Sequence, residues 1–90
     1  MALDGMDLEV IQPLIPQLNN AVNELQSIIT STSNAYSTIE GHWNGKDADQ
    51  FHSQWPSFTS ALNQAHNDLT QLHTHLQSNY NAQQQASNSY

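Results

Sequence analysis

The chain has 90 residues, enough for one small domain, and carries eight acidic residues against a single lysine. Its net charge of −7 repels phosphates and anionic lipid heads, which disfavours nucleic-acid binding and peripheral membrane binding. The chain has no cysteine, which excludes a disulfide framework and thiol catalysis. We expect no stable membrane insertion, because no segment approaches the roughly 20 apolar residues that a spanning helix needs. We also expect no conventional signal peptide, because no basic start is followed by an apolar run.

Apolar residues at steps of three and four predict two long amphipathic helices. The first ladder consists of Ile11, Ile15, Leu18, Val22, Leu25, Ile29, Thr32, Tyr36, Ile39 and Trp43. The second consists of Ala48, Phe51, Trp55, Phe58, Leu62, Ala65, Leu69, Leu72 and Leu76. Because proline is accepted in a first helical turn, Pro13 and Pro16 favour a first helix over about 12–41. Residues 8–11 form either a preceding turn or an extended arm.

The triplet Trp43-Asn44-Gly45 lies between the two ladders and predicts a chain reversal over 42–46. Gly45 is expected to adopt a positive φ angle, which ends a helix without steric penalty only for glycine. Asp47 and Asp49 place negative charge at the start of a second helix, expected over about 47–80. The sequence therefore predicts an all-α fold, a single antiparallel helix-turn-helix hairpin domain covering residues 1–90.

Two features of the second helix are less regular. Pro56 lies inside it and removes one backbone hydrogen bond, so it predicts a kink, with a helix that starts only at residue 55 or 56 as the alternative. Residues 81–90 have no apolar period, and we expect them to form a disordered tail.

The apolar stripe of the first helix is three columns wide, whereas that of the second is narrower. A narrow stripe satisfies one neighbouring helix, and a wider one requires more than one. The hypothesis is that two hairpins pair through their first helices into a four-helix bundle dimer. The predicted dimer face consists of Leu14, Leu18, Ala21, Leu25, Ile28 and Ala35.

Chemistry-bearing residues do not assemble into a catalytic or metal site. His52, His66 and His73 share one column beside the predicted seam, but they are separated by 14 and 7 residues, about 10 Å or more along the helix axis, too far for one metal ion. A pH-sensing role for these histidines stays open because imidazole titrates near neutrality. With no nucleophile elbow and no phosphate loop, we expect no enzyme, no catalytic residue, no metal and no cofactor.

The central triplet is followed by residues that extend the pattern to Trp43, Gly45, Asp47, Ala48, Phe51 and Trp55. This pattern, between two amphipathic helices in a chain of about this length, resembles the WXG family of small type VII secretion proteins, in its actinobacterial form. The resemblance covers residues 8–80. It implies a hairpin that forms a homodimer or a heterodimer with a related WXG-type protein.

The resemblance also implies export from the cytoplasm by a membrane ATPase of Gram-positive and actinobacterial cells, so a secreted, non-enzymatic protein is expected. In that family, the Trp-x-Gly turn contributes to a bipartite export signal whose second half is a tyrosine followed four residues later by an acid. Tyr80 is the candidate for that tyrosine, but Gln84 stands where the acid belongs, which puts independent export in doubt. The alternative is an intracellular adaptor or chaperone that pairs with the helical amino-terminal region of a larger toxin or effector.

Overall fold

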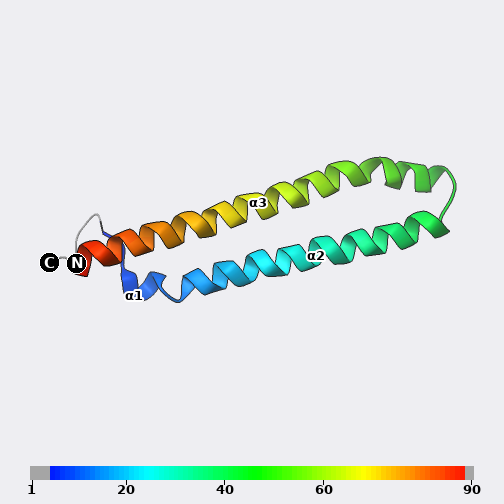
Figure 1. The fold of residues 1–90 in the computed structure, drawn as a ribbon. Helices are drawn as coiled ribbons and strands as arrows, with labels where there is room; N and C mark the ends of the chain where they lie inside the picture. Colours follow the sequence, from blue (N-terminus) through cyan, green and yellow to red (C-terminus); the bar gives the residue numbers. More distant parts are fainter. Residues whose placement is uncertain (1–4, 89–90) are drawn as a thin grey trace.

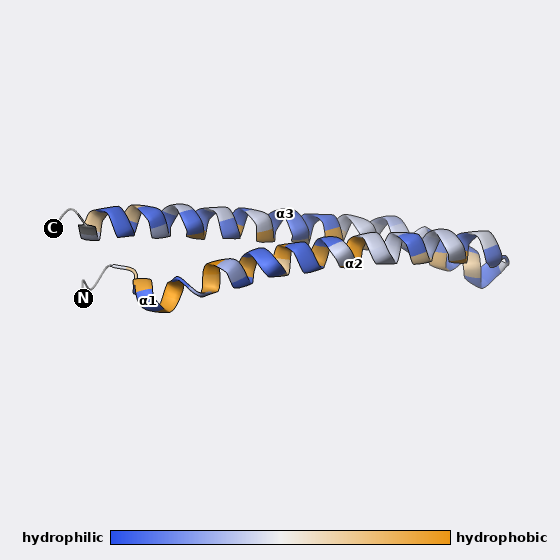
Figure 2. Ribbon diagram, turned by 60° about the horizontal axis from the view of Figure 1, so that its bottom comes forward, coloured by the Kyte–Doolittle hydropathy of each residue, from blue (hydrophilic) through white to orange (hydrophobic). Residues whose placement is uncertain are grey.

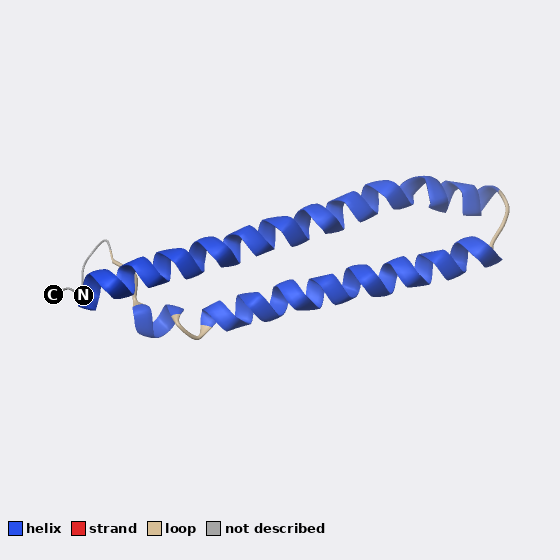
Figure 3. Ribbon diagram, viewed as in Figure 1, coloured by secondary structure: helices blue, strands red, loops and turns tan. Residues whose placement is uncertain are grey.

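The computed structural model describes residues 5–88, which form three helices (Figure 3). The helices are α1 (Leu8–Ile11), α2 (Leu14–His42) and α3 (Lys46–Asn88), and no strand occurs within residues 5–88. Helices α2 and α3 run antiparallel, with the turn at one end and α1 at the other (Figure 1). The molecule measures 68 × 18 × 15 Å, and its radius of gyration of 20.1 Å far exceeds the roughly 12 Å of a compact chain of this length. The predicted helical hairpin is confirmed.

The amino-terminal residues form the short helix α1, so the turn-like alternative for residues 8–11 is the right one. Its N-cap is Asp7, whose carboxylate accepts a hydrogen bond from the Val10 amide at 3.4 Å. Gln12 and Pro13 separate α1 from α2, and α2 begins at Leu14, two residues later than predicted. Pro16 lies in the first turn of α2, where a proline removes no intrahelical hydrogen bond.

The reversal between α2 and α3 is short and depends on Gly45. Its φ angle is +118°, as predicted, and residues 5–88 hold no other residue with a positive φ. The carbonyl of Gly45 accepts the first hydrogen bond of α3, from the Asp49 amide at 2.9 Å. Asp47 and Asp49 both lie in the first turn of α3, where their charges complement the helix dipole.

Helix α3 is continuous through Pro56, so the alternative of a helix delayed to residue 55 or 56 is wrong. Pro56 has no amide hydrogen to donate to the carbonyl of His52. The part of α3 next to the turn curves relative to the rest of the helix (Figure 1). Ring contacts with Tyr36 hold the helix just before the proline, and the rings of Trp55 and Phe58, with centroids 5.3 Å apart, contact each other across it.

At its other end, α3 extends to Asn88, whereas the sequence analysis predicted a disordered tail from residue 81. Residues 81–88 contain neither glycine nor proline, and alanine and glutamine are good helix formers. Gln77 donates to the side-chain oxygen of Asn81 at 3.0 Å across one helical turn, and Tyr80 is only 8% exposed. Side-chain contacts and helix propensity thus stabilise α3 over residues 81–88, although these residues have no apolar periodicity. Residues 89 and 90 lie outside the described residues.

The seam between α2 and α3 is thin. Among residues 5–88 the buried apolar side chains are Ile15, Ile29, Ala48 and Tyr80. In Figure 2 the most hydrophobic colouring lies on α1 and the first half of α2, while α3 is largely hydrophilic. A hairpin with so few buried residues has limited hydrophobic stabilisation.

Helix α3 is rotated relative to the predicted seam. The ladder residues Phe58, Ala65 and Leu72 are exposed. The half-buried positions on α3 instead include Thr59, His66 and His73. The prediction that the whole ladder packs inward, with the histidines flanking it, is therefore wrong for α3. One neighbouring helix covers only part of the stripe, and the stacking of Tyr36 on Trp55 selects which part.

Candidate protein-interaction site

Aromatic side chains from both helices gather at the turn end. Tyr36 of α2 stacks on Trp55 of α3 with ring centroids 4.3 Å apart and an interplanar angle of 2°. His52 meets the Tyr36 ring edge-on at 5.5 Å. Trp43 lies tilted on Phe51, with centroids 5.6 Å apart. These contacts join the last two turns of α2 to the first three of α3, so the turn is held by rings rather than by a deep core.

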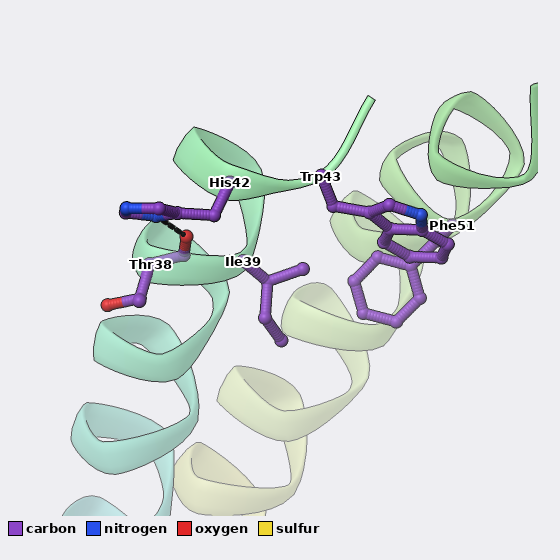
Figure 4. Close-up of a pocket in the computed structure, with 5 residues that line it drawn as sticks. All are labelled: Thr38, Ile39, His42, Trp43 and Phe51. Atoms are coloured by element: carbon purple, nitrogen blue, oxygen red, sulfur yellow. Dashed lines mark hydrogen bonds between the residues drawn. The ribbon is translucent and has the colours of Figure 1, made fainter. Parts of the chain in front are cut away.

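Trp43 contacts its neighbours but stays 40% exposed. It borders an open hollow of about 510 Å³, lined also by Thr38, Ile39, His42 and Phe51. Figure 4 shows the indole lying against the Phe51 ring and Ile39 of α2 on the side facing the two rings, while the His42 imidazole points away from them, beside Thr38. Nδ1 of His42 lies 2.8 Å from the carbonyl oxygen of Thr38, which fixes the imidazole beside the hollow. The Trp-x-Gly turn therefore combines an intramolecular contact with an accessible apolar surface.

Tyr36 links the ring cluster to the charge on α2. Partial burial raises the pKa of its hydroxyl, and the side-chain hydrogen bond to Glu40 and the negative charge of that carboxylate raise it further. The phenol thus favours its neutral form, which donates to the carboxylate one helical turn away.

Exposed apolar side chains extend from this end along one side of the hairpin. Thr38 and His42 of α2 line the first hollow together with Phe51 of α3, so these three residues lie on the same side of the hairpin. From each helix, one column of residues at seven-residue spacing continues along the same side of the hairpin. On α2 they pass through Ala35, Ile28, Ala21 and Leu14, and on α3 through Phe58, Ala65 and Leu72. We call this set, with Ile39 and Trp43, the apolar face.

Several members of the apolar face are far more exposed than is usual for such side chains. Ile28 is 51% exposed, Phe58 47% and Leu72 56%. Beyond the first hollow, two more lie beside the face, one at Phe51, Gln54, Trp55 and Phe58, the other at Leu14, Gln17, Leu18 and Leu76. An apolar strip with shallow hollows is a surface of the kind that protein partners cover.

The predicted dimer-face residues divide into two groups in the structure. Leu14, Ile28 and Ala35 are exposed, and Ala21 is half-buried at the edge. Leu18 and Leu25 are half-buried and belong to the column directed toward α3. Phe58 and Leu72 are absent from the predicted face, because the narrower stripe of the second helix was expected to be covered by the first helix alone.

The remaining candidate residues lie apart from this face. Tyr80, the candidate export tyrosine, is buried near α1, which contacts α3. His52, His66 and His73 line the seam at successive levels, and no group of histidine and carboxylate side chains within the described part of the chain is arranged to hold a metal ion. Nδ1 of His52 and Oγ1 of Thr59 are enclosed without a hydrogen-bond partner.

Comparison with known protein families gives one match. The family model of WXG100, proteins of 100 residues with WXG, matches residues 5–88. The chain belongs to the WXG100 family. No match was found among curated proteins, and none among solved structures.

Members of WXG100 are small, non-enzymatic helical proteins known as secreted substrates of type VII systems, and they generally pair with related partners. In this WXG100 chain the name-giving triplet is Trp43-Asn44-Gly45, at the turn that the ring cluster holds. None of the helices within residues 5–88 is long and apolar enough to cross a membrane.

Proposed function

We propose that this WXG100 protein is a secreted partner subunit of an actinobacterial-type type VII system and acts by pairing with a related hairpin. The ATPase of the system would move the paired hairpins from the cytoplasm to the exterior. Recognition, rather than chemistry, is the activity. The apolar face carries this proposal, because it offers each helix a second neighbour in a four-helix bundle.

The seam adds a second reason for pairing. Nδ1 of His52 and Oγ1 of Thr59 are buried without partners, and each such atom costs about 1–3 kcal/mol. Few side chains are buried to offset that cost. A partner that covers Ile28, Phe58 and Leu72 would bury three of the four most exposed large apolar side chains and raise the stability of the hairpin.

Substitution of Ile28 by aspartate tests the pairing. Ile28 is half-exposed in the single hairpin, so Ile28→Asp should leave the hairpin helical while placing an unpaired carboxylate in the closed bundle. We expect the dissociation constant of the dimer to rise by about 100-fold or more. Sedimentation velocity and circular dichroism measure the two effects.

Asn23→Asp is the matched control, since Asn23 is exposed on α2 outside the apolar face and the substitution adds the same charge. It should leave pairing unchanged within about twofold. A wild-type protein that is fully helical yet monomeric at tens of micromolar, with or without candidate hairpins from the same genome, would contradict the proposed pairing.

Tyr80 favours a second candidate function, that of an intracellular adaptor for the helical amino-terminal region of a larger toxin or effector. Tyr80 is buried, and the residue four positions later is Gln84 rather than an acid, so an export signal of the family type is incomplete. Fractionation of culture medium and cells distinguishes the two. The adaptor predicts that the chain stays in the cells, whereas the leading proposal places it in the medium.

A further inference from the structure

We propose that the apolar face binds a helical hairpin that is not a copy of this chain and that carries lysine or arginine along the edges of its own face. This inference rests on the proposed pairing function and specifies the chemistry of the partner. Three observations carry it: the position of acidic side chains along the face, their alignment across it, and the scarcity of basic residues in the chain.

Acidic side chains stand on both long edges of the apolar face. Gln17 and Thr38 of α2 line hollows on this face, and Glu24 lies between them at seven-residue spacing. Gln54 of α3 lines the third hollow, and Asp68 follows two seven-residue steps later. Helical residues seven apart occupy nearly the same angular position. Glu24 therefore borders the face on the α2 side, and Asp68 borders it on the α3 side.

These two carboxylates lie at the same level along the hairpin. Tyr36 stacks on Trp55, and the two helices run antiparallel. Moving twelve residues back from Tyr36 reaches Glu24, and moving twelve forward from Trp55 reaches the residue before Asp68. The carboxylates thus flank one stretch of the apolar face, close to Ile28. Asp68 is held in place by the amide of Gln64, which donates to its Oδ1 at 2.9 Å.

The rim has no lysine or arginine that could neutralise it in a second copy. All seven acidic side chains among residues 5–88 are exposed, and Lys46, the one lysine or arginine, lies at the turn next to Asp47. Two copies together carry twice −7, or −14, against two lysines. As the face closes, water leaves the rim and repulsion between like charges strengthens.

A partner with lysine or arginine at the matching rim positions converts that repulsion into attraction. The length of the apolar face calls for a partner with an apolar strip of similar length, which a second long helical hairpin provides. Charge complementarity of this kind selects between partners that would bury the same apolar area. The apolar face thus gives affinity, and the acidic rim gives the choice of partner.

A charge-inverted variant of the chain supplies the probe. Glu24→Lys combined with Asp68→Lys keeps the apolar face and reverses the rim. We expect it to pair with wild-type protein at least about tenfold more tightly than wild-type protein pairs with itself in 50 mM NaCl. In 500 mM NaCl the mixed pair should weaken and the wild-type pair should strengthen, because salt screens both interactions. Sedimentation velocity with one fluorescently labelled component measures all the pairs.

A second variant controls for net charge alone, because the charge-inverted variant changes the net charge by four units. It adds the same four positive charges by substituting lysine at four exposed positions outside the apolar face and its rim, Asn19, Asn23, Ser60 and Asn63. Its affinity for wild-type protein should stay within about twofold of the wild-type self-affinity. Equal tightening by the charge-inverted variant and by the charge-matched control would overturn the role of the rim.

The remaining outcomes separate this inference from the proposed function. A wild-type homodimer that is as tight as the mixed pair and insensitive to salt overturns the choice of a non-identical partner but leaves the pairing function intact. Absence of association in every combination, including the mixed pair at hundreds of micromolar, overturns both. Introducing Ile28→Asp into both components of the mixed pair should abolish its association, which shows that the apolar face is the surface in use.

Discussion

The two ends of the hairpin are held together in different ways. At the turn, side chains such as Tyr36 and Trp55 stack in close contact, yet Trp43 and Phe58 stay 40% and 47% exposed. At the opposite end fewer rings are present, but Tyr80 and Ile15 are buried, at 8% and 7% exposed. Apart from the small side chain of Ala48, which is 1% exposed, the turn end thus has many ring contacts and little burial. The terminal end has fewer ring contacts and more burial of large side chains. Contacts between exposed rings orient a surface for another molecule, whereas burial mainly stabilises the chain itself.

The largest expected effect compares the two ends directly. Tyr80→Ala should lower the free energy of unfolding by about 3–4 kcal/mol, because a nearly buried ring is removed, and Trp43→Ala by about 2 kcal/mol, because part of the indole is already in water. Urea unfolding followed by circular dichroism measures both. If Trp43→Ala proves the more damaging, ring contacts outweigh burial in this fold and the comparison is wrong.

Glycine substitutions sharpen the contrast within the turn end. Gly45→Ala should destabilise the hairpin by about 1–2 kcal/mol, since alanine is strained at a φ of +118°. No side chain or backbone atom lies within 4 Å of an added Cβ at either Gly45 or Gly41, so contacts do not complicate the comparison. Gly41→Ala, inside α2, should instead stabilise by about 0.5–1 kcal/mol. If Gly45→Ala and Gly41→Ala change the stability in the same direction, the φ angle of Gly45 is not the cause of its effect.

A smaller effect is expected at the terminal end. Asp7 caps α1, and Asp7→Ala should cost about 0.5–1 kcal/mol as α1 loses its N-cap. Because α1 contacts α3, hydrogen exchange of the amides near Tyr80 should accelerate, while amides near the turn keep their protection. Uniform acceleration along the whole of α3 would show that the two ends do not respond separately.

The smallest effect concerns alkaline pH at the turn end. The pKa of Tyr36 is raised in the folded protein, so the native state retains this proton after the unfolded chain has released it. The resulting stability is present below a pH of about 10, the unfolded value, and is lost as the pH rises through the folded pKa. Tyr36→Phe should therefore flatten the loss of stability between pH 9 and pH 11, measured by urea unfolding. If stability depends on pH in the same way in Tyr36→Phe, the Tyr36 hydroxyl is not the group responsible for the loss.

The local features of the hairpin could be predicted from the sequence because each has a local cause. Gly45 follows from steric limits on φ, and the two ladders follow from the helical period. The rotation of α3 could not be predicted in this way, because the columns of Phe58 and His66 flank the same central column, that of Trp55 and Leu62. Which column faces α2 depends on how rings from both helices stack, and that is a tertiary property.

The same distinction applies to the candidate site. The Trp-x-Gly turn was located from its residues, and half of the exposed face, through Leu14 and Ile28, came from the width of the stripe. The α3 half needed the structure, since exposure depends on which neighbour is already in place. The extension of α3 to Asn88 was missed for another reason: helix propensity and contacts near Tyr80 sustain a helix that has no apolar period.

The single glycine turn also bears on the order in which the chain folds. Tyr36 and Trp55, the stacked pair near the turn, are 19 residues apart in the sequence, whereas Leu14 and Leu76, which share a hollow at the other end, are 62 apart. Closing the longer loop first would cost about 1 kcal/mol more chain entropy than closing the shorter one. Folding should therefore nucleate at the aromatic turn and proceed by zipping toward the termini, with each step shortening the loop that the next must close. Substitutions near Trp55 should slow folding, and those near Leu76 should mainly speed unfolding.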